Sequence, residues 1–534
     1  MPKYISLLFL FIFLMSCKTA SKLQQSPTPT EPYRPAYHFT PPAHWMNDPN
    51  GMVYYEGEYH LFYQYYPEGD KWGPMHWGHA VSRDLVRWEH LPIALYPDSL
   101  GLIFSGSAVV DWKNTSGFGQ NGKPPLVAIF TQHDMAKEKA GATDFQVQSI
   151  AYSNDKGRTW TKYKHNPVLP NPGKPDFRDP KVIWHEATQK WVMVLAEKDH
   201  VNFYNSPDLK TWTQTGIFGR VFGSHAGVWE CPDLFPIKVE GRTDVKWVLT
   251  QSINPGGPNG GSATQYFVGD FDGKKFILDP VFQHAMGKFK ADPKQGTPEL
   301  ERAVWLDYGR DNYAGVTFSD IPASDGRRIA IGWMSNWDYA QDVPTKPWRS
   351  AMTIPRQFFL KNMPEGYRLF SRPVKEMETL RKKQFAIPPR TFKGAWDLTT
   401  ESGIAPGSME LDLSISLPPG AIFDIELSND AGNRYLISYD AALKQFSSDR
   451  TQAGKSDFSA KFAAKPHLAP RQVDEEAVRL HLYFDRASCE LFADGGATVL
   501  TDIFFPNGDF THWKLIGRNY NVVLNAGTAW ALSK

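Results

Sequence analysis

The sequence predicts an all-β protein in which a five-bladed β-propeller is followed by a C-terminal β-sandwich. Past residue 40, runs of β-branched and aromatic residues are broken by Gly, Asp, Asn and Pro, which is typical of short strands joined by turns. One short motif recurs four times, and a second pattern, in which a polar cluster leads into paired strands, recurs five times. A chain of 534 residues is too long for one ordinary core, so at least two domains are expected.

The first repeat is a Ser-x-Asp or Gly-Asp turn that follows an apolar strand and leads to an aromatic residue. Its copies are SRDLVRW ending at Trp88, SNDKGRTW ending at Trp160, SPDLKTW ending at Trp212 and GDFDGKKF ending at Phe276. The copies lie roughly 50 to 70 residues apart. Self-similarity at this spacing predicts repeated antiparallel sheets, the blades of a propeller.

The second pattern marks the start of each blade. The five units begin with NDPNGMVYY at Asn47, FSGSAVVD at Phe104, FRDPKVIW at Phe177, ECPDLFPI at Glu230 and DNYAGVTF at Asp311. The first strand of every blade lines the central channel, so equivalent positions converge on one axis. Asp48, Asp179 and Glu230 occupy nearly the same place in three units: a carboxylate, then Pro directly or one residue later, then a strand. These three carboxylates are therefore predicted to meet.

Two carboxylates that face one pocket can hydrolyse a glycoside. One ionised carboxylate attacks the anomeric carbon, and one protonated carboxyl gives its proton to the leaving oxygen. Asp48 lies in a turn rich in backbone donors and amides, which favours its ionised form. Glu230 follows the apolar HAGVW and is expected to stay protonated as the acid. Arg178 is expected to hold Asp179 ionised, where it would accept hydrogen bonds from sugar hydroxyls.

Composition favours a neutral ligand. The 58 basic and 57 acidic residues give a net charge of +1, so there is no electrostatic case for nucleic acid or an anionic surface. Aromatic residues make up 14% of the chain and include 18 Trp, which suits stacking on the apolar faces of sugars. The alternative for any single Trp is a place in a large β core.

A metal site is the main chemical alternative. Three carboxylates can bind Ca²⁺ or Mg²⁺, and His44, His76 and His79 raise the question of zinc. The sequence has no HExxH motif and no tight His-x-His spacing, and its three cysteines form no CxxC pair. We therefore predict no metal, no cofactor and no disulfide framework.

The N-terminus predicts export and a lipid anchor. Lys3 precedes an apolar run, Tyr4 to Met15, which is too short to span a bilayer, so residues 1–16 are predicted to be a signal peptide. The sequence LMSC, Leu14 to Cys17, resembles the lipobox of bacterial lipoproteins, in which the cysteine is lipidated. Residues 17–36 are polar and Pro-rich and predict a flexible tether. The prediction is a protein anchored to a bacterial membrane, periplasmic or at the cell surface, with a plain secretory signal as the alternative.

Composition also sets the predicted domain boundaries. The propeller is expected over 37–357 and a connector over 358–383, of which LFSRPVKEMETLRKK, residues 369–383, indicates a short helix or a connector. Residues 384–534 contain alternating strands such as SMELDLSISL and AVRLHLYFDR without a chemical cluster, which predicts a β-sandwich.

Together, WMNDPNG, FRDP and ECPD resemble glycoside hydrolase family 32, the fructan hydrolases and invertases. The resemblance runs from about Tyr37 to the end of the chain and includes YQYYPEGDKWG, WGHAVSRDLVRW, FSGSAVV, YFVGDFDGKKF, GWMSNWDYA and PWRSAMTIPR. DRASCELFADGG, residues 485–496, resembles the β-sandwich module of the family. This resemblance implies a five-bladed propeller and a retaining double displacement.

The resemblance also implies a role for each site residue. Asp48 would be the nucleophile that forms a fructosyl-enzyme at C2, Glu230 the acid/base and Asp179 the transition-state stabiliser. The terminal fructose would be held by Asn47, Gln64, Trp72, Phe104, Ser105, Arg178, Tyr313 and Trp333.

The expected partner is a neutral fructose-containing oligo- or polysaccharide, such as levan, inulin, fructo-oligosaccharides or sucrose. The loops YPEGDKWG and DVPTKPWRSAMTIPR resemble those of exo-acting enzymes, which favours release of single fructose units. An endo-acting levanase or inulinase, a sucrose-preferring invertase and a transfructosylating enzyme stay open. A lipoprotein that binds glycans without cleaving them is the alternative from another functional class.

Overall fold

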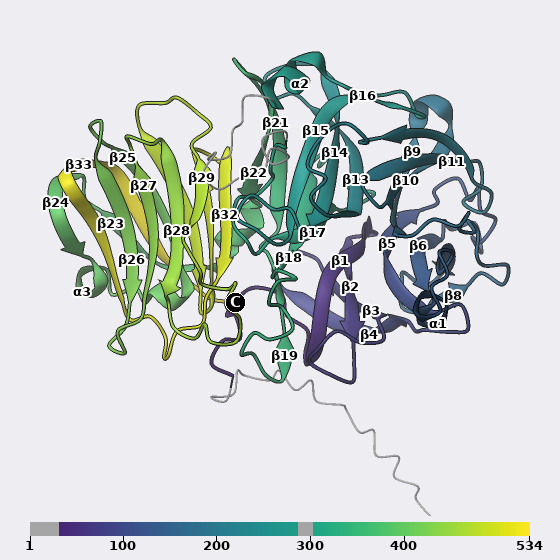
Figure 1. Ribbon diagram of the computed structural model, residues 1–534, viewed down its shortest axis with the longest axis horizontal. Coiled ribbons are helices and arrows are strands. Elements are labelled where there is room, and N and C mark those ends of the chain that lie inside the picture. Colours follow the sequence, from purple (N-terminus) through teal and green to yellow (C-terminus); the bar gives the residue numbers. More distant parts are fainter. Residues whose placement is uncertain (1–30, 287–302) are drawn as a thin grey trace, which may run out of the picture.

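Two β-rich domains lie side by side in the computed structural model, which describes residues 31–286 and 303–534 (Figure 1). The sandwich is on the left of the view, the propeller is on the right, and the C-terminus lies between them. The predicted signal peptide, the Cys17 anchor and most of the tether lie outside the described residues. No helix within the described ranges has the length and apolar character needed to cross a lipid bilayer.

The propeller consists of five antiparallel blades that follow one another along the chain, as predicted. Blade I has β1 (His44–Tyr55), β2 (Glu58–Tyr66), β3 (His76–Ser82) and β4 (Trp88–Leu95). Blade II has β5 (Leu102–Val110), β6 (Leu126–His133), β7 (Gln146–Ser153) and β8 (Thr161–Lys162), with α1 (Met135–Lys139) between β6 and β7. Blade III has β9 (Phe177–His185), β10 (Lys190–Glu197), β11 (His200–Ser206) and β12 (Thr213–Phe218).

Blades IV and V complete the ring. Blade IV has β13 (Val228–Lys238), β14 (Val245–Asn254), β15 (Ala263–Phe271) and β16 (Phe276–Leu278), followed by α2 (Pro280–Met286). Blade V has β17 (Tyr313–Thr317), β18 (Arg328–Met334), β21 (Arg356–Met363) and β22 (Gly366–Pro373), and β20 (Ala351–Met352) also pairs with β18. The short β19 (Trp348–Arg349) runs parallel to the start of β1, so chain that belongs to blade V is hydrogen-bonded to blade I.

The recurring Asp motif forms the turn between the third and fourth strands of a blade. In blade I, Asp84 accepts a hydrogen bond from the backbone N–H of Arg87 at 2.7 Å, and the indole of Trp88 donates to the carbonyl of Leu85 at 2.9 Å. Equivalent carboxylate-to-backbone bonds form at Asp155, Asp208 and Asp272. The carboxylate satisfies backbone donors that the turn leaves free, which explains why the motif repeats.

The innermost strands β1, β5, β9, β13 and β17 surround the channel, and the ladder that each forms with its neighbour has a register shift. The shifts fall between Met46 and Pro49, Ile103 and Gly106, Arg178 and Lys181, Glu230 and Asp233, and Tyr313 and Val316. A β-bulge bends its strand and changes where its side chains point. All five inner strands therefore change direction at the level where their polar residues stand.

The C-terminal domain is a β-sandwich of eleven strands, as predicted. These are β23 (Arg381–Ile387), β24 (Arg390–Asp397), β25 (Met409–Ser416), β26 (Ile422–Ser428), β27 (Arg434–Asp440), β28 (Gln445–Gln452), β29 (His467–Pro470), β30 (Val478–Asp485), β31 (Ser488–Ala493), β32 (Thr498–Ile503) and β33 (His512–Leu532). The first part of β33 pairs with β24 and β26, and its last part pairs with β23 and β25. One 21-residue strand thus joins the two layers.

The predicted connector, residues 358–383, differs from the structure. β21 and β22 form a hairpin with Arg356 opposite Pro373, and β21 pairs with β18, so both strands belong to blade V. Phe358 is buried and stacks on Phe235 of blade IV at 5.9 Å. Between the domains lies only the short 3₁₀ helix Lys375–Leu380, because the strands assigned to a connector are needed to cover blade IV.

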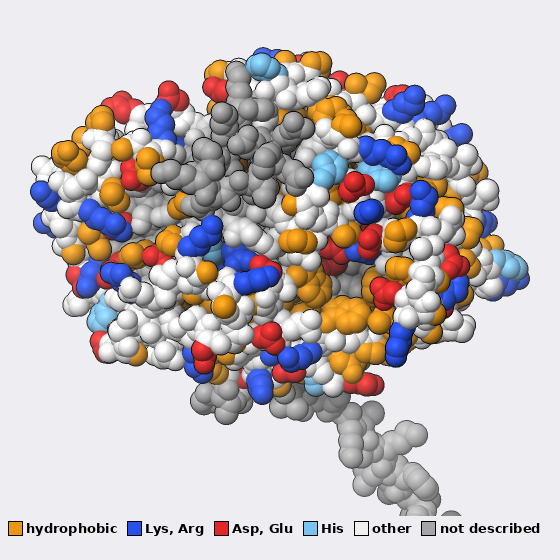
Figure 2. Space-filling model, viewed as in Figure 1, with side chains coloured by type: hydrophobic (Ala, Val, Ile, Leu, Met, Phe, Trp, Pro, Cys, Tyr) orange, Lys and Arg blue, Asp and Glu red, His pale blue; other side chains and the backbone are white. Residues whose placement is uncertain are grey.

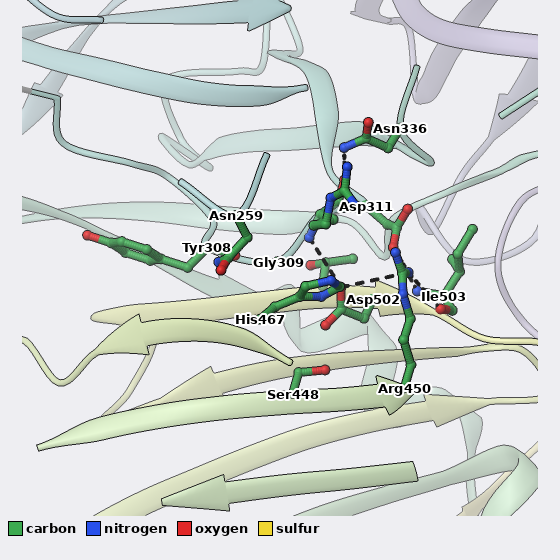
Figure 3. A network of polar contacts seen from close by, with 12 residues as sticks. Asn259, Tyr308, Gly309, Asp311, Asn336, Ser448, Arg450, His467, Asp502 and Ile503 are labelled. Carbon is green, nitrogen blue, oxygen red and sulfur yellow. Dashed lines mark hydrogen bonds and ion pairs between the residues drawn. The ribbon is translucent and has the colours of Figure 1, made fainter. Parts of the chain in front are cut away.

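Buried charges from both domains meet at the interface. Arg450, on β28, is fully buried and donates to Asp311 at 2.6 Å and to the Ile503 carbonyl at 2.9 Å (Figure 3). It also donates to the Tyr339 hydroxyl at 2.8 Å. Asp502, on β32, accepts a hydrogen bond from His467 at 2.7 Å. Removing one partner of a buried ion pair leaves an uncompensated charge, so such contacts hold an interface in one arrangement.

A second buried cluster ties the segment before β1 to the sandwich. His38 bonds through Nδ1 to Asp485 and through Nε2 to Glu490, both at 2.8 Å. Glu490 also pairs with Arg356, which bonds to Asp307 at 2.9 Å. Burial alone would lower the pKa of His38, but the hydrogen bonds to Asp485 and Glu490 outweigh it and raise the pKa to about 9. His38 is therefore an imidazolium at neutral pH.

This raised pKa predicts a loss of stability in mild alkali. Because the folded-state pKa of His38 exceeds the unfolded value of about 6.5, its contribution is complete below pH 6.5 and is lost as pH rises through 9. We expect the free energy of unfolding to fall by up to about 3 kcal/mol over that window. Denaturant melts at pH 6, 7.5 and 9 measure it.

In the His38→Gln variant the stability should be lower at pH 6 and should change less with pH. His512→Gln is the matched control, since His512 is exposed and pairs with the exposed Asp430. An unchanged pH slope in His38→Gln would contradict the assignment.

Candidate active site

The structure brings the three predicted carboxylates into one cavity. Asp48 on β1, Asp179 on β9 and Glu230 on β13 all line a cavity of about 260 Å³. On the face seen in Figure 2, the surface is hollowed over the propeller, and acidic side chains lie in and around the hollow. Residues far apart in the sequence therefore meet because each stands at the same level of its own blade.

Strained backbone occurs at one of these carboxylates, Asp179, and at Cys231, which follows another. Asp179 and Cys231 have φ values of 65° and 47°, in the left-handed region that non-glycine residues rarely adopt. The N–H of Cys231 donates to the carboxylate of Asp179 at 3.0 Å, and the N–H of Asp179 donates to the hydroxyl of Thr131 at 3.0 Å. Such conformations persist only where the surroundings over-determine them, and they cluster at functional sites.

Asp48 is held by donors from three directions. Ser105 donates to its Oδ2 at 2.7 Å, the amide of Asn47 donates to its Oδ1 at 3.0 Å, and the thiol of Cys231 lies 3.4 Å from Oδ2. Burial and the nearby charge of Glu230 raise the pKa of Asp48 above its ordinary value, and these three contacts oppose the rise. The donors that favour the ionised form are thus side chains, two of them from other blades, rather than the backbone of the turn.

The pKa of Asp179 differs from what the sequence predicts. Burial raises its pKa to about 7, even though the charge of Arg178 lowers it. The guanidinium of Arg178 instead bonds to Glu230, from Nη2 at 3.0 Å and from Nε at 3.2 Å, and to Asp176 at 2.6 Å. Successive side chains of a strand point to opposite faces, and here the side chain of Arg178 points toward Glu230 and not toward the carboxylate of Asp179. The charge of Arg178 thus acts on the pKa of Asp179 in the predicted direction but does not offset the effect of burial.

Glu230 is oriented by two donors. Arg178 bonds to its Oε1, and the hydroxyl of Tyr313 donates to its Oε2 in a short contact. Burial, with the charge of Glu230, raises the pKa of Tyr313 well above its ordinary value, so the phenol keeps its proton and remains a donor. Both carboxyl oxygens of Glu230 are thus fixed in direction by side chains from blades III and V.

Most of the predicted binding residues line the cavity. These are Asn47, Gln64, Trp72, Phe104, Ser105 and Arg178. Tyr313 reaches the site through Glu230, whereas Trp333 does not reach the cavity. Trp333 is fully buried and packs against Trp45 and Trp337, with ring centroids 6.1 and 4.9 Å away. Trp333 therefore supports the wall of the cavity rather than forming its surface.

Other wall residues were not predicted from the sequence. They are His133, Glu138, Gln146, Asp176 and Trp337. Phe104 stacks on His133 with ring centroids 4.3 Å apart, and His133 bonds to Glu138 at 3.0 Å and to Gln146 at 3.1 Å. The blade repeat identifies only the first strand of each blade, but these residues lie on β6, α1, β7 and two loops, one before β9 and one after β18. The available signals were the polar run TQHDMAKE and the second Trp of GWMSNW.

The histidines considered for zinc have other partners. His79 bonds to His60 at 3.1 Å and stacks on Phe62 at 4.0 Å, and His76 bonds to the carbonyl of Pro74 at 2.9 Å. In the part of the chain that the structure describes, no group of three or more His, Cys, Asp and Glu side chains is arranged to hold a metal ion. Cys231 and Cys489 are buried free thiols.

Comparison with known proteins identifies the family. Residues 38–373 match the Glycosyl hydrolases family 32 N-terminal domain, and residues 376–531 match Glycosyl hydrolases family 32 C terminal. The chain belongs to glycosyl hydrolase family 32. The two matches meet between residues 373 and 376, where the structure also ends blade V, and a member of this family is a glycosidase.

Similar proteins agree in sequence and in fold. A levanase of Bacillus subtilis is 47% identical over 540 residues, which cover 100% of this chain and 75% of the levanase. An extracellular exo-inulinase of Aspergillus awamori is 42% identical and covers 91% of this chain and 92% of the inulinase. The crystal structure of exo-inulinase from the same organism superposes with a TM-score of 0.83 at 37% identity, covering 95% of this chain and 100% of that one. The β-fructofuranosidase of Schwanniomyces occidentalis, complexed with fructosyl-erythritol, gives a TM-score of 0.79 at 30% identity and covers 94% and 98%.

Proposed function

We propose that this family 32 glycosidase hydrolyses β-fructosides and releases single fructose units from the ends of levan, inulin and fructo-oligosaccharides. The similar levanase and exo-inulinase support the substrate class. The observation that carries the proposal is a small cavity in which three carboxylates from three blades meet.

The size and lining of the cavity support action at a chain end. Its volume of about 260 Å³ is below the roughly 300–1,000 Å³ typical of sites for drug-sized ligands. Aromatic side chains, Trp72, Phe104 and Trp337, form part of its wall, and amides such as Asn47 and Gln64 offer hydrogen bonds to hydroxyl groups. A cavity of this kind suits one terminal sugar unit better than the interior of a polysaccharide.

The proposed reaction uses Asp48 and Glu230 in a double displacement. Ionised Asp48, held by Ser105 and Asn47, attacks the anomeric C2 of fructose, while Glu230 gives its proton to the oxygen of the leaving group. Glu230 then takes a proton from water as that water releases fructose from Asp48, so the configuration is retained.

Asp179 and the acidic lining are proposed to stabilise the transition state. Among the described residues, five acidic side chains line the cavity, Asp48, Glu138, Asp176, Asp179 and Glu230, together with the guanidinium of Arg178. This excess of acidic over basic side chains stabilises a sugar ring that becomes cationic in the transition state more than it stabilises the neutral substrate. In its ionised form, Asp179 would accept hydrogen bonds from sugar hydroxyls that strengthen as the ring gains charge.

Asp48→Asn tests the nucleophile. The change keeps the shape of the side chain but removes the oxygen anion that forms the covalent intermediate, so we expect kcat to fall by on the order of 10⁴-fold or more. Asp84→Asn is the matched control in the same blade, because Asp84 holds a surface turn. Fructose release from inulin gives the rates, and near-normal turnover of Asp48→Asn would refute the assignment.

A time course of products tests exo action. With levan and inulin as substrates, we expect fructose from the first time points and no ladder of oligosaccharides, because the cavity admits a chain end. Early oligosaccharides would show endo action instead. Sucrose at low and high concentration completes the comparison, since fructosyl transfer would appear as longer products at high sucrose.

The protein is further proposed to be exported and lipid-anchored through Cys17. The apolar run from Tyr4 to Met15 and the LMSC sequence support this, as does the similar exo-inulinase described as extracellular. In a bacterial host, wild-type protein should sediment with membranes, and Cys17→Ala should not carry the lipid. Ser16→Ala is the control that leaves the cysteine in place. Membrane association of Cys17→Ala equal to that of wild type would rule out the anchor.

A further inference from the structure

The wall residue Trp337 stands on a loop between the two domains. The loop follows β18, and Trp337 lines the cavity while being partly buried. Its ring stacks on Trp45 with centroids 5.9 Å apart and an interplanar angle of 28°. Trp45 donates to Asn47 at 2.7 Å, and Asn47 donates to Asp48 at 3.0 Å. The position of Trp337 is thus linked by direct contacts to the carboxylate proposed as the nucleophile.

Asn336 fixes the loop on the propeller side. Its amide donates to the carbonyl of Arg310 at 2.7 Å, and its side-chain oxygen accepts from the N–H of Asp338 at 3.0 Å. The N–H of Trp337 donates to the hydroxyl of Ser262 at 3.1 Å. Figure 3 shows Asn336 beside the buried network at the domain interface. These bonds fix the backbone on both sides of Trp337.

The next two residues of the loop, Asp338 and Tyr339, are each held by one residue of the sandwich and one of the propeller. Asp338 pairs with Lys461 at 2.7 Å and with Arg310 at 2.5 Å. The hydroxyl of Tyr339 donates to Asp311 at 2.7 Å and accepts from Arg450 at 2.8 Å. Tyr339 and Arg450 are 1% exposed or less, so no water competes for their bond.

We propose that Arg450 and Lys461 of the sandwich are positioning residues for the active site. Arg450 acts through Tyr339, and Lys461 acts through Asp338, and together they set where Trp337 closes the cavity. The sandwich then contributes to turnover as well as to stability. This inference rests on the proposed function only in taking the cavity as the place of reaction.

Tyr339→Phe removes the hydroxyl through which Arg450 holds the loop and changes no other atom of the side chain. The ring stays packed at 5.0 Å from Phe462, and Arg450 keeps its pair with Asp311, so the fold is expected to survive. We expect kcat/KM for inulin to fall by about tenfold, since a small misplacement of a binding group costs that much or more. Tyr435→Phe is the matched control: Tyr435 is equally buried, and its hydroxyl bonds to Ser448 at 2.7 Å inside the sandwich.

Lys461→Met tests the second link without disturbing the core. Lys461 is 67% exposed, so its loss should hardly alter stability. We expect kcat/KM to fall about threefold. Lys444→Met is the control, because Lys444 forms a similar exposed pair with Asp474 within the sandwich.

A double-mutant cycle separates positioning from general destabilisation, because spatial continuity alone does not show coupling. In a Trp337→Ala background, Tyr339→Phe should have no further effect on kcat/KM, although its effect on the unfolding midpoint should persist. Equal loss of kcat/KM in Tyr435→Phe, full additivity with Trp337→Ala, or unchanged kcat/KM in Tyr339→Phe would overturn the inference. A wild-type protein that releases no fructose would instead overturn the proposed function.

Discussion

The site depends on one backbone constraint, the break in strand register that every inner strand makes at the same level of the channel. A regular strand sends alternate side chains into the two faces of its own blade, where they pack against neighbouring blades. The bulges turn polar residues toward the axis instead. Positive φ angles at Asp179 and Cys231 cost about 1–3 kcal/mol each, and the bond from the Cys231 N–H to Asp179 offsets part of this cost.

Gathering carboxylates creates a second constraint, because like charges in a buried place oppose ionisation. A different set of hydrogen-bond donors offsets this cost at each carboxylate. Asp48 has hydroxyl, amide and thiol donors, Glu230 has a guanidinium and a phenol, and Asp179 has a backbone N–H. Burial raises the pKa of Asp179 to about 7, so the positive charge and the donor near this carboxylate only partly offset the cost of burying its negative charge. A cationic ring in the cavity would supply the missing positive charge, which is the condition for binding the transition state better than the neutral substrate.

Sequence reasoning succeeded where a repeat carried the information. Each of the five blade openings places a polar cluster before an apolar strand, and this pattern predicts the inner strands and the meeting of Asp48, Asp179 and Glu230. Sequence patterns do not predict contacts that depend on the direction in which a side chain points or on packing between residues far apart in the chain. The sequence predicts that Arg178 acts on its neighbour Asp179, whereas in the structure its side chain bonds to Glu230. Trp333 and Trp337 lie in one motif, and only packing decides which of them faces the cavity.

The interface between the domains explains the remaining failures of prediction. Residues 358–383 look like a connector in sequence because the composition changes there, yet β21 and β22 reach to residue 373 and belong to blade V. β21 begins at Arg356, which pairs with Asp307 and Glu490. Arg450, Asp311 and Asp502 are likewise buried charges that no local pattern pairs, since their partners lie up to 192 residues away. Charges buried in this way are stable only with both domains in place. Every described residue that lines the cavity belongs to the propeller, but the loop that carries Trp337 is bonded to both domains, so the proposed positioning of Trp337 depends on the two together.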